Sequence, residues 1–244
     1  MNNNFIQSLE LQKDKIESFE KYPFNLDVIR YLYKIEFHKN VTFILGENWS
    51  WKSTLLEALA IEYWLNPEWG SNNINFKTTE THSELSEKII ISKWIVPKDK
   101  FFLRTESFYN VASEIDNIQK EFWGMHWAYW WKSLHQQSHW ESFFSLFLNR
   151  FWANWVYILD EPEAALSPQR QLAFLIRLDE LVKQNSQFII VTHSPIILSY
   201  PNSKIIEISE NWINETLYKD TNHYNTYKMF LDNPEYMFKK LDIN

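Results

Sequence analysis

The 244-residue chain contains no cysteine and only three glycines. The lack of cysteine excludes disulfides and cysteine-ligated zinc, and it is compatible with a reducing compartment. No run of residues approaches the ~18 apolar positions that a membrane helix needs, and the first residues, "MNNNFIQSLELQKDK", lack the apolar core of a signal peptide. We therefore expect a cytoplasmic protein without a membrane segment. The net charge of −7 does not indicate nucleic acid as a partner.

The shortage of glycine is matched by an excess of tryptophan. Glycine averages about 7% of residues, so roughly 17 are expected in a chain of this length. Tryptophan is normally among the rarest residues, yet it occurs 13 times. The excess is close in size to the shortage, which suggests that most Trp letters stand where glycine belongs.

The order of predicted elements indicates an α/β fold with a mainly parallel central sheet, flanking helices and a small helical subdomain. Apolar, β-branched segments predict strands at residues 27–37, 40–45, 87–96, 99–107, 155–162, 186–195 and 204–210, the last as an edge strand. Helical spacing of apolar residues predicts helices at 53–64, at 167–185 and in the tail after Asn222. We predict a single domain over residues 1–244, in which 1–25 form a helical N-terminal extension and about 108–150 form an inserted helical region.

The segment "GENWSWKST" lies between a predicted strand and a predicted helix. A phosphate-binding loop occupies this context and reads Gly, four residues, Gly, Lys, then Ser or Thr. Its backbone N–H groups surround a phosphate at the positive end of the helix. The candidate binding residues are Gly46, Glu47, Asn48, Trp49, Ser50, Trp51, Lys52, Ser53 and Thr54.

Within this loop, Lys52 would meet the β- and γ-phosphates of a nucleotide, and Ser53 would ligate Mg²⁺. Trp51 stands where the pattern has glycine, and a side chain forced into a positive-φ conformation costs about 1–3 kcal/mol. The alternative is an ordinary helix N-terminus that merely carries a Lys and a Ser.

Two further segments place polar residues at the ends of predicted strands. Asp160 and Glu161 follow "VYIL"; Asp160 is suited to hold Mg²⁺, and Glu161 to act as a general base on an attacking water. His193 follows "IIVT", and the carboxyl ends of parallel strands are where such sheets bind ligands. Lys52, Glu161 and His193 are therefore the catalytic candidates. The alternatives are two acids that cap the next helix and a structural histidine.

Together these segments resemble bacterial AAA family ATPases of the ATP-binding-cassette type, which are P-loop NTPases related to the heads of chromosome-maintenance and repair ATPases. Where this chain has "GENWSWKST", "YWWKSLHQQSHWES", "RFWANWVYILDEPEAALSPQRQ" and "VTHSP", the family has GENGSGKST, YGGKSLHEQSHGES, RFGGNGLYILDEPEAALSPQRQ and ATHSP. The resemblance runs from about residue 28 to the tail. It implies an ATPase that uses ATP and Mg²⁺.

The resemblance also implies a homodimer that closes around two ATP molecules. The segment "QSHWES", with Ser138, Trp140 and Glu141 at its core, corresponds to the family signature that contacts the γ-phosphate of the partner's ATP. Ser167 lies in the segment that corresponds to the loop meeting the other subunit, and His193 corresponds to a γ-phosphate sensor. The resemblance leaves open an additional protein partner.

The role of Glu106 and the class of phosphate-loop enzyme each have an alternative. Glu106, in the region that leads to the family's lid, is a candidate for contact with water or Mg²⁺, or else a buried structural acid. A P-loop kinase is a different reading of the phosphate loop, but neither a second substrate site nor a basic lid is evident in the sequence.

Several Trp letters fall on family glycines, namely Trp49, Trp51, Trp64, Trp69, Trp130, Trp131, Trp140, Trp152 and Trp155. The codon UGA specifies glycine in some bacterial genetic codes and tryptophan in others. Translation of a UGA-glycine gene with a UGA-tryptophan table would produce this pattern. The alternative is a genuine Trp-bearing homologue that acts as a nucleotide-gated adaptor without catalysis.

We predict that the codons at positions 49, 51, 130, 131, 140, 152 and 155 are UGA. Mass spectrometry of the native protein tests the same point, because each glycine in place of tryptophan lowers the mass. UGG at most of these positions would contradict the misreading.

Overall fold

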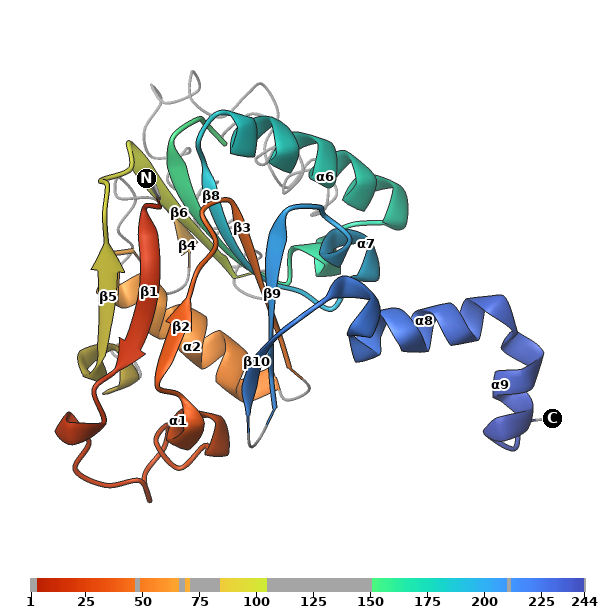
Figure 1. The fold of residues 1–244 in the computed structure, drawn as a ribbon, viewed down its shortest axis with the longest axis horizontal. Helices are drawn as coiled ribbons and strands as arrows, with labels where there is room; N and C mark the ends of the chain where they lie inside the picture. The colour runs from red at the N-terminus through yellow and green to blue at the C-terminus, as the bar shows by residue number, and fades with distance from the viewer. Residues whose placement is uncertain are drawn as a thin grey trace, which may run out of the picture.

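The computed structural model describes residues 4–46, 49–65, 69–70, 84–104, 151–209 and 212–243. Five apolar segments form parallel strands of one sheet: β3 (Val41–Leu45), β6 (Asp99–Arg104), β7 (Trp155–Asp160), β8 (Gln187–Val191) and β9 (Ser203–Ile208). The strand order is β10-β9-β3-β8-β7-β6-β4, and the edge strands β10 (Ile213–Thr216) and β4 (Trp69–Gly70) are antiparallel to their neighbours. The predicted α/β fold with a mainly parallel sheet is thus confirmed (Figure 1).

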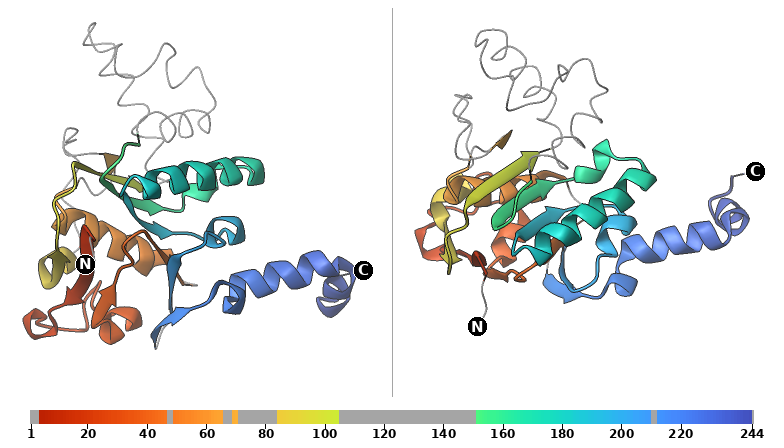
Figure 2. Two further views of the ribbon diagram at one scale, coloured as in Figure 1. Left: turned by 45° about the horizontal axis from the view of Figure 1, so that its top comes forward. Right: turned by 90° about the horizontal axis from the view of Figure 1, so that it is seen from above.

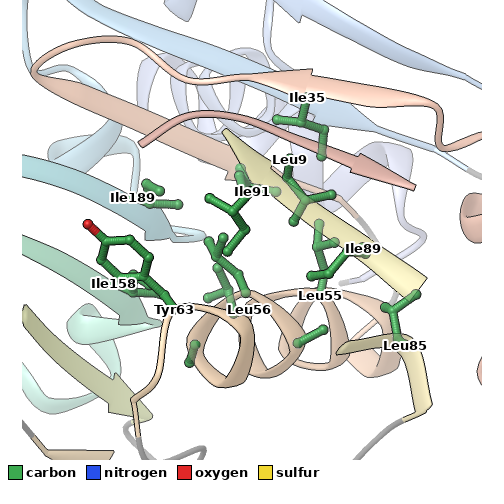
Figure 3. Close-up of a cluster of buried hydrophobic side chains, with 14 of the residues drawn as sticks. Leu9, Ile35, Leu55, Leu56, Tyr63, Leu85, Ile89, Ile91, Ile158 and Ile189 are labelled. Carbon is green, nitrogen blue, oxygen red and sulfur yellow. The ribbon is translucent and has the colours of Figure 1, made fainter. Parts of the chain in front are cut away.

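A second, antiparallel sheet packs beside the first. Its strands are β1 (Ile6–Leu11), β2 (Lys34–Glu36) and β5 (Ile89–Lys93), in the order β2-β1-β5. Helix α2 (Trp49–Glu62) contacts β5 of this sheet and β7 of the main one. Figure 3 shows the apolar cluster where they meet, with Leu9 and Ile91 from the small sheet, Leu55 from α2 and Ile158 from the main sheet.

The other face of the main sheet is covered by α6 (Pro168–Lys183), as Figure 1 and Figure 2 show. Three side chains of this helix are fully buried against the sheet, namely Phe174, Leu178 and Leu181. They belong to the same apolar cluster as Tyr157 and Phe188 of the sheet. The helix begins as its sequence predicts, because Ser167 is the N-cap and Pro168 occupies the first helical position. A short helix, α7 (Pro195–Leu198), follows β8.

Three predictions about local structure are wrong. Residues 1–25 do not form a helical extension, because β1 buries Ile6, Leu9 and Leu11 at the centre of the small sheet. Residues 27–37 are not one strand: helix α1 (Asp27–Tyr31) precedes β2, and a single helical turn buries Val28 and Ile29 on one side. Strand β9 is not an edge strand, because β10 pairs with its outer side.

One buried side chain ties the two sheets together. The amide of Gln187, at the start of β8, accepts a hydrogen bond from the Ile6 N–H at 2.8 Å and donates to the carbonyl oxygens of Ile6 at 2.8 Å and His38 at 2.9 Å. Gln187 is fully buried, so the loss of these bonds would leave backbone groups of β1 without partners. The small sheet is therefore fixed to the strand that leads to the candidate site.

The tail forms helices α8 (Asn222–Asp232) and α9 (Pro234–Lys240), which confirms the prediction of short helices there. Figure 1 and Figure 2 show that they extend away from the sheets, and neither contains a buried residue. The predicted helical region at 108–150 lies outside the described residues. Among those that are described, no helix has both the length and the apolar character needed to cross a bilayer.

The backbone at the end of α2 supports the prediction that glycine belongs at position 64. Trp64 has a φ of 62°, its N–H donates to the Ile61 carbonyl at 2.8 Å, and the Leu65 N–H donates to the Ala60 carbonyl at 2.8 Å. This is the Schellman arrangement, whose left-handed residue is usually glycine. The other non-glycine residues with positive φ are Asn, Asp or Glu. Trp64 is thus the one bulky aromatic residue in this conformation among those described.

We expect Trp64→Gly to be more stable than Trp64→Ala by about 1 kcal/mol, because both remove the indole but only glycine adopts the left-handed conformation freely. Urea unfolding of the two variants measures the difference. The matched pair at Trp152, another exposed tryptophan whose φ is not positive, should show no advantage for glycine. Equal stabilities at position 64 would contradict the assignment.

Candidate functional site

The candidate phosphate loop connects β3 to α2. Strand β3 ends at Leu45, and α2 begins at Trp49, so the predicted strand–loop–helix order is present. Glu47 and Asn48 lie outside the described residues, as do the side chains of Trp49 and Ser50. The Thr54 hydroxyl lies 2.7 Å from the Tyr22 hydroxyl, which places this side chain against the N-terminal region.

Lys52 is at the centre of the site. Its side chain is only 1% exposed. The ammonium group donates to the Gly46 carbonyl at 2.5 Å, and its nitrogen lies 2.6 Å from Nε2 of His193. Burial lowers the pKa of Lys52, whereas the charges of Glu161, Asp160 and Glu163 act in the opposite direction. The nearby carboxylates therefore favour the charged form of the amine.

Ser53 and Asp160 form the second part of the site. Asp160 is the last residue of β7 and is buried, and its Oδ2 accepts a hydrogen bond from the Ser53 hydroxyl at 3.0 Å. A hydroxyl and a carboxylate are oxygen ligands of the kind Mg²⁺ prefers, and Mg²⁺ usually takes only one or two carboxylates besides phosphate and water. The pair therefore fits a magnesium ion, although the described residues contain no cluster of three or more His, Cys, Asp or Glu side chains suited to a metal.

Glu161 follows β7 in a strained backbone conformation. Its φ and ψ are 51° and 53°, in the left-handed region, and its N–H donates to the Val191 carbonyl at 3.0 Å. Its Oε1 lies 3.4 Å from Nε2 of His193. The hydrogen bond to His193 is the main cause that lowers the pKa of Glu161, and the charges of His193 and Lys52 add to it against the effect of burial. Glu161 is thus kept as an ionised carboxylate, the form that can accept a proton.

Two residues of the site were not predicted from the sequence. Glu163 accepts a hydrogen bond from the His193 N–H at 2.5 Å, and burial raises its pKa. His223, in the first turn of α8, has its Nε2 2.9 Å from Nδ1 of His193. The repeated acids of "DEPE" could have drawn attention to Glu163. No local pattern could have identified His223, which lies 30 residues beyond His193 in the chain.

The structure therefore brings Lys52, Asp160, Glu161 and His193 together at the carboxyl ends of β3, β7 and β8. Their catalytic and metal-binding roles remain predictions. Ser167 is the exposed N-cap of α6, and its place at a subunit contact stays a prediction. The predicted signature residues Ser138, Trp140 and Glu141 lie outside the described residues, and so does Glu106.

Trp51 turns into the protein. It is 5% exposed and belongs to the apolar cluster of α2. A Cβ added to Gly46 would overlap Cζ2 of this indole and would lie 2.8 Å from the Ile208 carbonyl oxygen. The indole thus fills the space directly beside the start of the loop.

Comparison with known proteins bears on the second half of the site. Residues 140–198 match the family model described as an AAA ATPase domain, a range that includes Asp160, Glu161 and His193. The chain is similar to an ATPase. The match confirms the predicted resemblance over these residues, which are fewer than half of the chain, and supports ATP binding and hydrolysis as its general activity. No curated protein matches the sequence.

The solved structures that are similar to this chain include two that cover most of its length. One is an ABC transporter described as metal-chelate type, in an inward-facing conformation, with 16% identity, a TM-score of 0.45 and coverage of 91% of this chain and 88% of that one. The other is the SMC head domain from Thermotoga maritima, with 16% identity, a TM-score of 0.43 and coverage of 87% and 99%. At these TM-scores neither structure bears on function.

The contact between Gly46 and Trp51 generates a stability prediction. In the Trp-bearing chain, Gly46→Ala should lower the free energy of unfolding by about 1–3 kcal/mol, because the new methyl group overpacks a filled space. In the Trp51→Gly background most of that loss should disappear, and only the approach to the Ile208 carbonyl should remain. A double-mutant cycle measured by urea unfolding gives the coupling. Additive effects would show that the indole does not pack against Gly46.

Proposed function

We propose that the protein binds and hydrolyses ATP with Mg²⁺, as a dimer that couples hydrolysis to a conformational change. The observation that carries this proposal is the meeting of Lys52, Ser53–Asp160, Glu161 and His193 at one edge of a parallel sheet. An ammonium, a hydroxyl–carboxylate pair and an ionised carboxylate are the groups that phosphoryl transfer to water requires. The ATPase family match includes the second half of this set.

Each residue has a distinct role in this proposal. Lys52 exchanges the Gly46 carbonyl and His193 for the β- and γ-phosphate oxygens. Ser53 and Asp160 would hold Mg²⁺, which supplies positive charge to the phosphates when bound. Glu161 orients the attacking water and accepts its proton, for which its ionised state is suited. His193 contacts the γ-phosphate from the end of β8.

The dimer would complete the site. In the proposed arrangement the signature segment, with Ser138, Trp140 and Glu141, contacts the γ-phosphate bound by the other subunit. Ser167 would lie at the same interface. Hydrolysis would then weaken the contact between the subunits, because the γ-phosphate that both of them bind is lost.

A nucleotide-gated adaptor without catalysis is the second candidate. The buried indole of Trp51 favours it, since it occupies space next to the loop that would hold phosphate. This candidate applies if Trp51 is genuine. It predicts that the Trp-bearing chain does not hydrolyse ATP even though its acids and His193 are retained.

For the chain translated with glycine at its UGA codons, we expect Glu161→Gln to bind Mg-ATP but to hydrolyse it about 10²–10⁴-fold more slowly. Glutamine preserves the size of the side chain but is a poor proton acceptor, whereas Lys52, Ser53 and Asp160 still bind the substrate. Phosphate release measures the rate. Size-exclusion chromatography with Mg-ATP should show a dimer that the variant retains longer than the parent.

Glu180→Gln, at an exposed position of α6, is the matched control and should retain the parental rate. A Glu161→Gln variant that hydrolyses at the parental rate would remove the residue from its proposed role. A protein that stays monomeric with saturating Mg-ATP would contradict the dimer. Comparison of the glycine-bearing and Trp-bearing chains decides between the ATPase and the adaptor.

A further inference from the structure

The imidazole rings of His193 and His223 lie beside the site with their centroids 5.2 Å apart and their planes tilted by 38°. His193 Nδ1 lies 2.9 Å from His223 Nε2, so one of these nitrogens must carry a proton and the other must accept it. The other nitrogen of His193, Nε2, lies 2.6 Å from the Lys52 ammonium and 3.4 Å from Oε1 of Glu161. Each neighbour of His193 therefore constrains where its proton can be.

Lys52 fixes the proton in the present arrangement. An ammonium donates hydrogen bonds and cannot accept them, so Nε2 of His193 must act as the acceptor in the shorter contact. A neutral His193 then carries its proton on Nδ1 and donates it to His223. Donation from Nε2 to Glu161 requires the opposite tautomer, so the two contacts of Nε2 belong to alternative states. The hydrogen bond from His193 that lowers the pKa of Glu161 belongs to the second state, and in the first state the charge of Lys52 acts in the same direction.

Nucleotide binding would reverse these roles. Once Lys52 engages phosphate oxygens, Nε2 of His193 has to donate, because both phosphate and the Glu161 carboxylate only accept. In a neutral His193, Nδ1 must then become an acceptor, and His223 must become the donor. An imidazole is suited to this exchange, because either of its nitrogens can carry the proton.

The exchange balances without a change of charge. The N–H bond at Nδ1 of His193 breaks as a new one forms at Nε2 of His223. The proton on Nδ1 of His223 is lost to solvent, which this buried nitrogen reaches only when the ring moves. Nε2 of His193 takes a proton from water. Both rings are neutral before and after.

The position of His223 is well defined for this role. It follows Thr221, the fully buried N-cap of α8, whose hydroxyl donates to the Tyr218 carbonyl at 2.8 Å and accepts from the Tyr224 N–H at 3.2 Å. His193 is held from the other side through its N–H, which donates to Glu163 at 2.5 Å. Both rings are thus anchored by their backbones.

We propose that His223 is a positioning residue that sets which nitrogen of His193 carries the proton, and that its own ability to change from acceptor to donor lets His193 leave Lys52 and face the γ-phosphate. This inference rests on the proposed ATPase function for its second state. Its first state, with the proton on Nδ1 of His193, concerns the protein without nucleotide and does not depend on the ATPase function.

Three variants of the native protein test the proposal. His223→Leu can neither donate nor accept, His223→Gln can do either by rotating its amide, and Lys228→Gln changes an exposed residue of the same helix. We expect kcat to fall at least about tenfold in His223→Leu, with KM within about twofold, because the groups that bind phosphate are retained. His223→Gln and Lys228→Gln should stay within about threefold of the native kcat.

Histidine-selective ¹⁵N NMR provides a readout that does not depend on hydrolysis. Without nucleotide, His193 should be protonated at Nδ1, and this proton should be protected from exchange in the native protein and in His223→Gln but not in His223→Leu. Addition of Mg²⁺ and adenylyl imidodiphosphate should move the proton to Nε2.

Protonation at Nε2 without nucleotide, or a protected Nδ1 proton in His223→Leu, would overturn the proposal. So would equal losses of kcat in His223→Leu and His223→Gln, which would indicate a merely structural role. If the native protein neither binds nor hydrolyses ATP, the proposed function fails, and the spectrum without nucleotide alone decides whether His223 sets the tautomer of His193.

Discussion

The buried charge of Lys52 is the constraint on which the arrangement of the site depends. An ammonium removed from water costs several kcal/mol unless charges and hydrogen bonds compensate for it. Compensation comes from the Gly46 carbonyl and from the carboxylates at the end of β7 and just after it. These groups reach Lys52 because β8 lies directly between β3 and β7 in the sheet. A slip of one residue in β7 would direct Asp160 to the opposite face.

Sequence patterns predicted those strands and helices whose apolar residues are spaced as their burial requires. Strands β3, β7 and β8 are continuous apolar runs and were recognised, as was α6 with its Ser-Pro start. Strand β1 was missed because the polar "IQSLEL" is buried by pairing on both sides and by the Gln187 amide, contacts that only the tertiary structure supplies. In the site, Lys52 was predicted from the phosphate-loop pattern, and Asp160 and Glu161 from their position at the end of an apolar strand. His223 lies on α8, and no sequence pattern connects it with them.

Backbone conformation separates two kinds of unusual residue. Glu161 adopts left-handed φ and ψ angles at the end of a buried strand, where its side chain meets His193, so the strain coincides with the proposed chemistry. Trp64 adopts a similar φ at the end of α2, where its side chain is 81% exposed. The first case is what a functional site requires. The second is what a glycine position looks like when a larger residue occupies it.

The order of strands in the main sheet also governs how the chain can fold during synthesis. Strand β3 pairs only with β8 and β9, which the ribosome makes more than a hundred residues later. Until then, the backbone edges of β3 have no partner strand, and its apolar side chains Val41, Phe43 and Leu45 are not yet packed in the core. Such long-range pairing forms slowly and leaves the chain prone to aggregation in the meantime. A nascent chain that stops before β8 would therefore be a substrate for chaperones and proteases rather than a partly working domain.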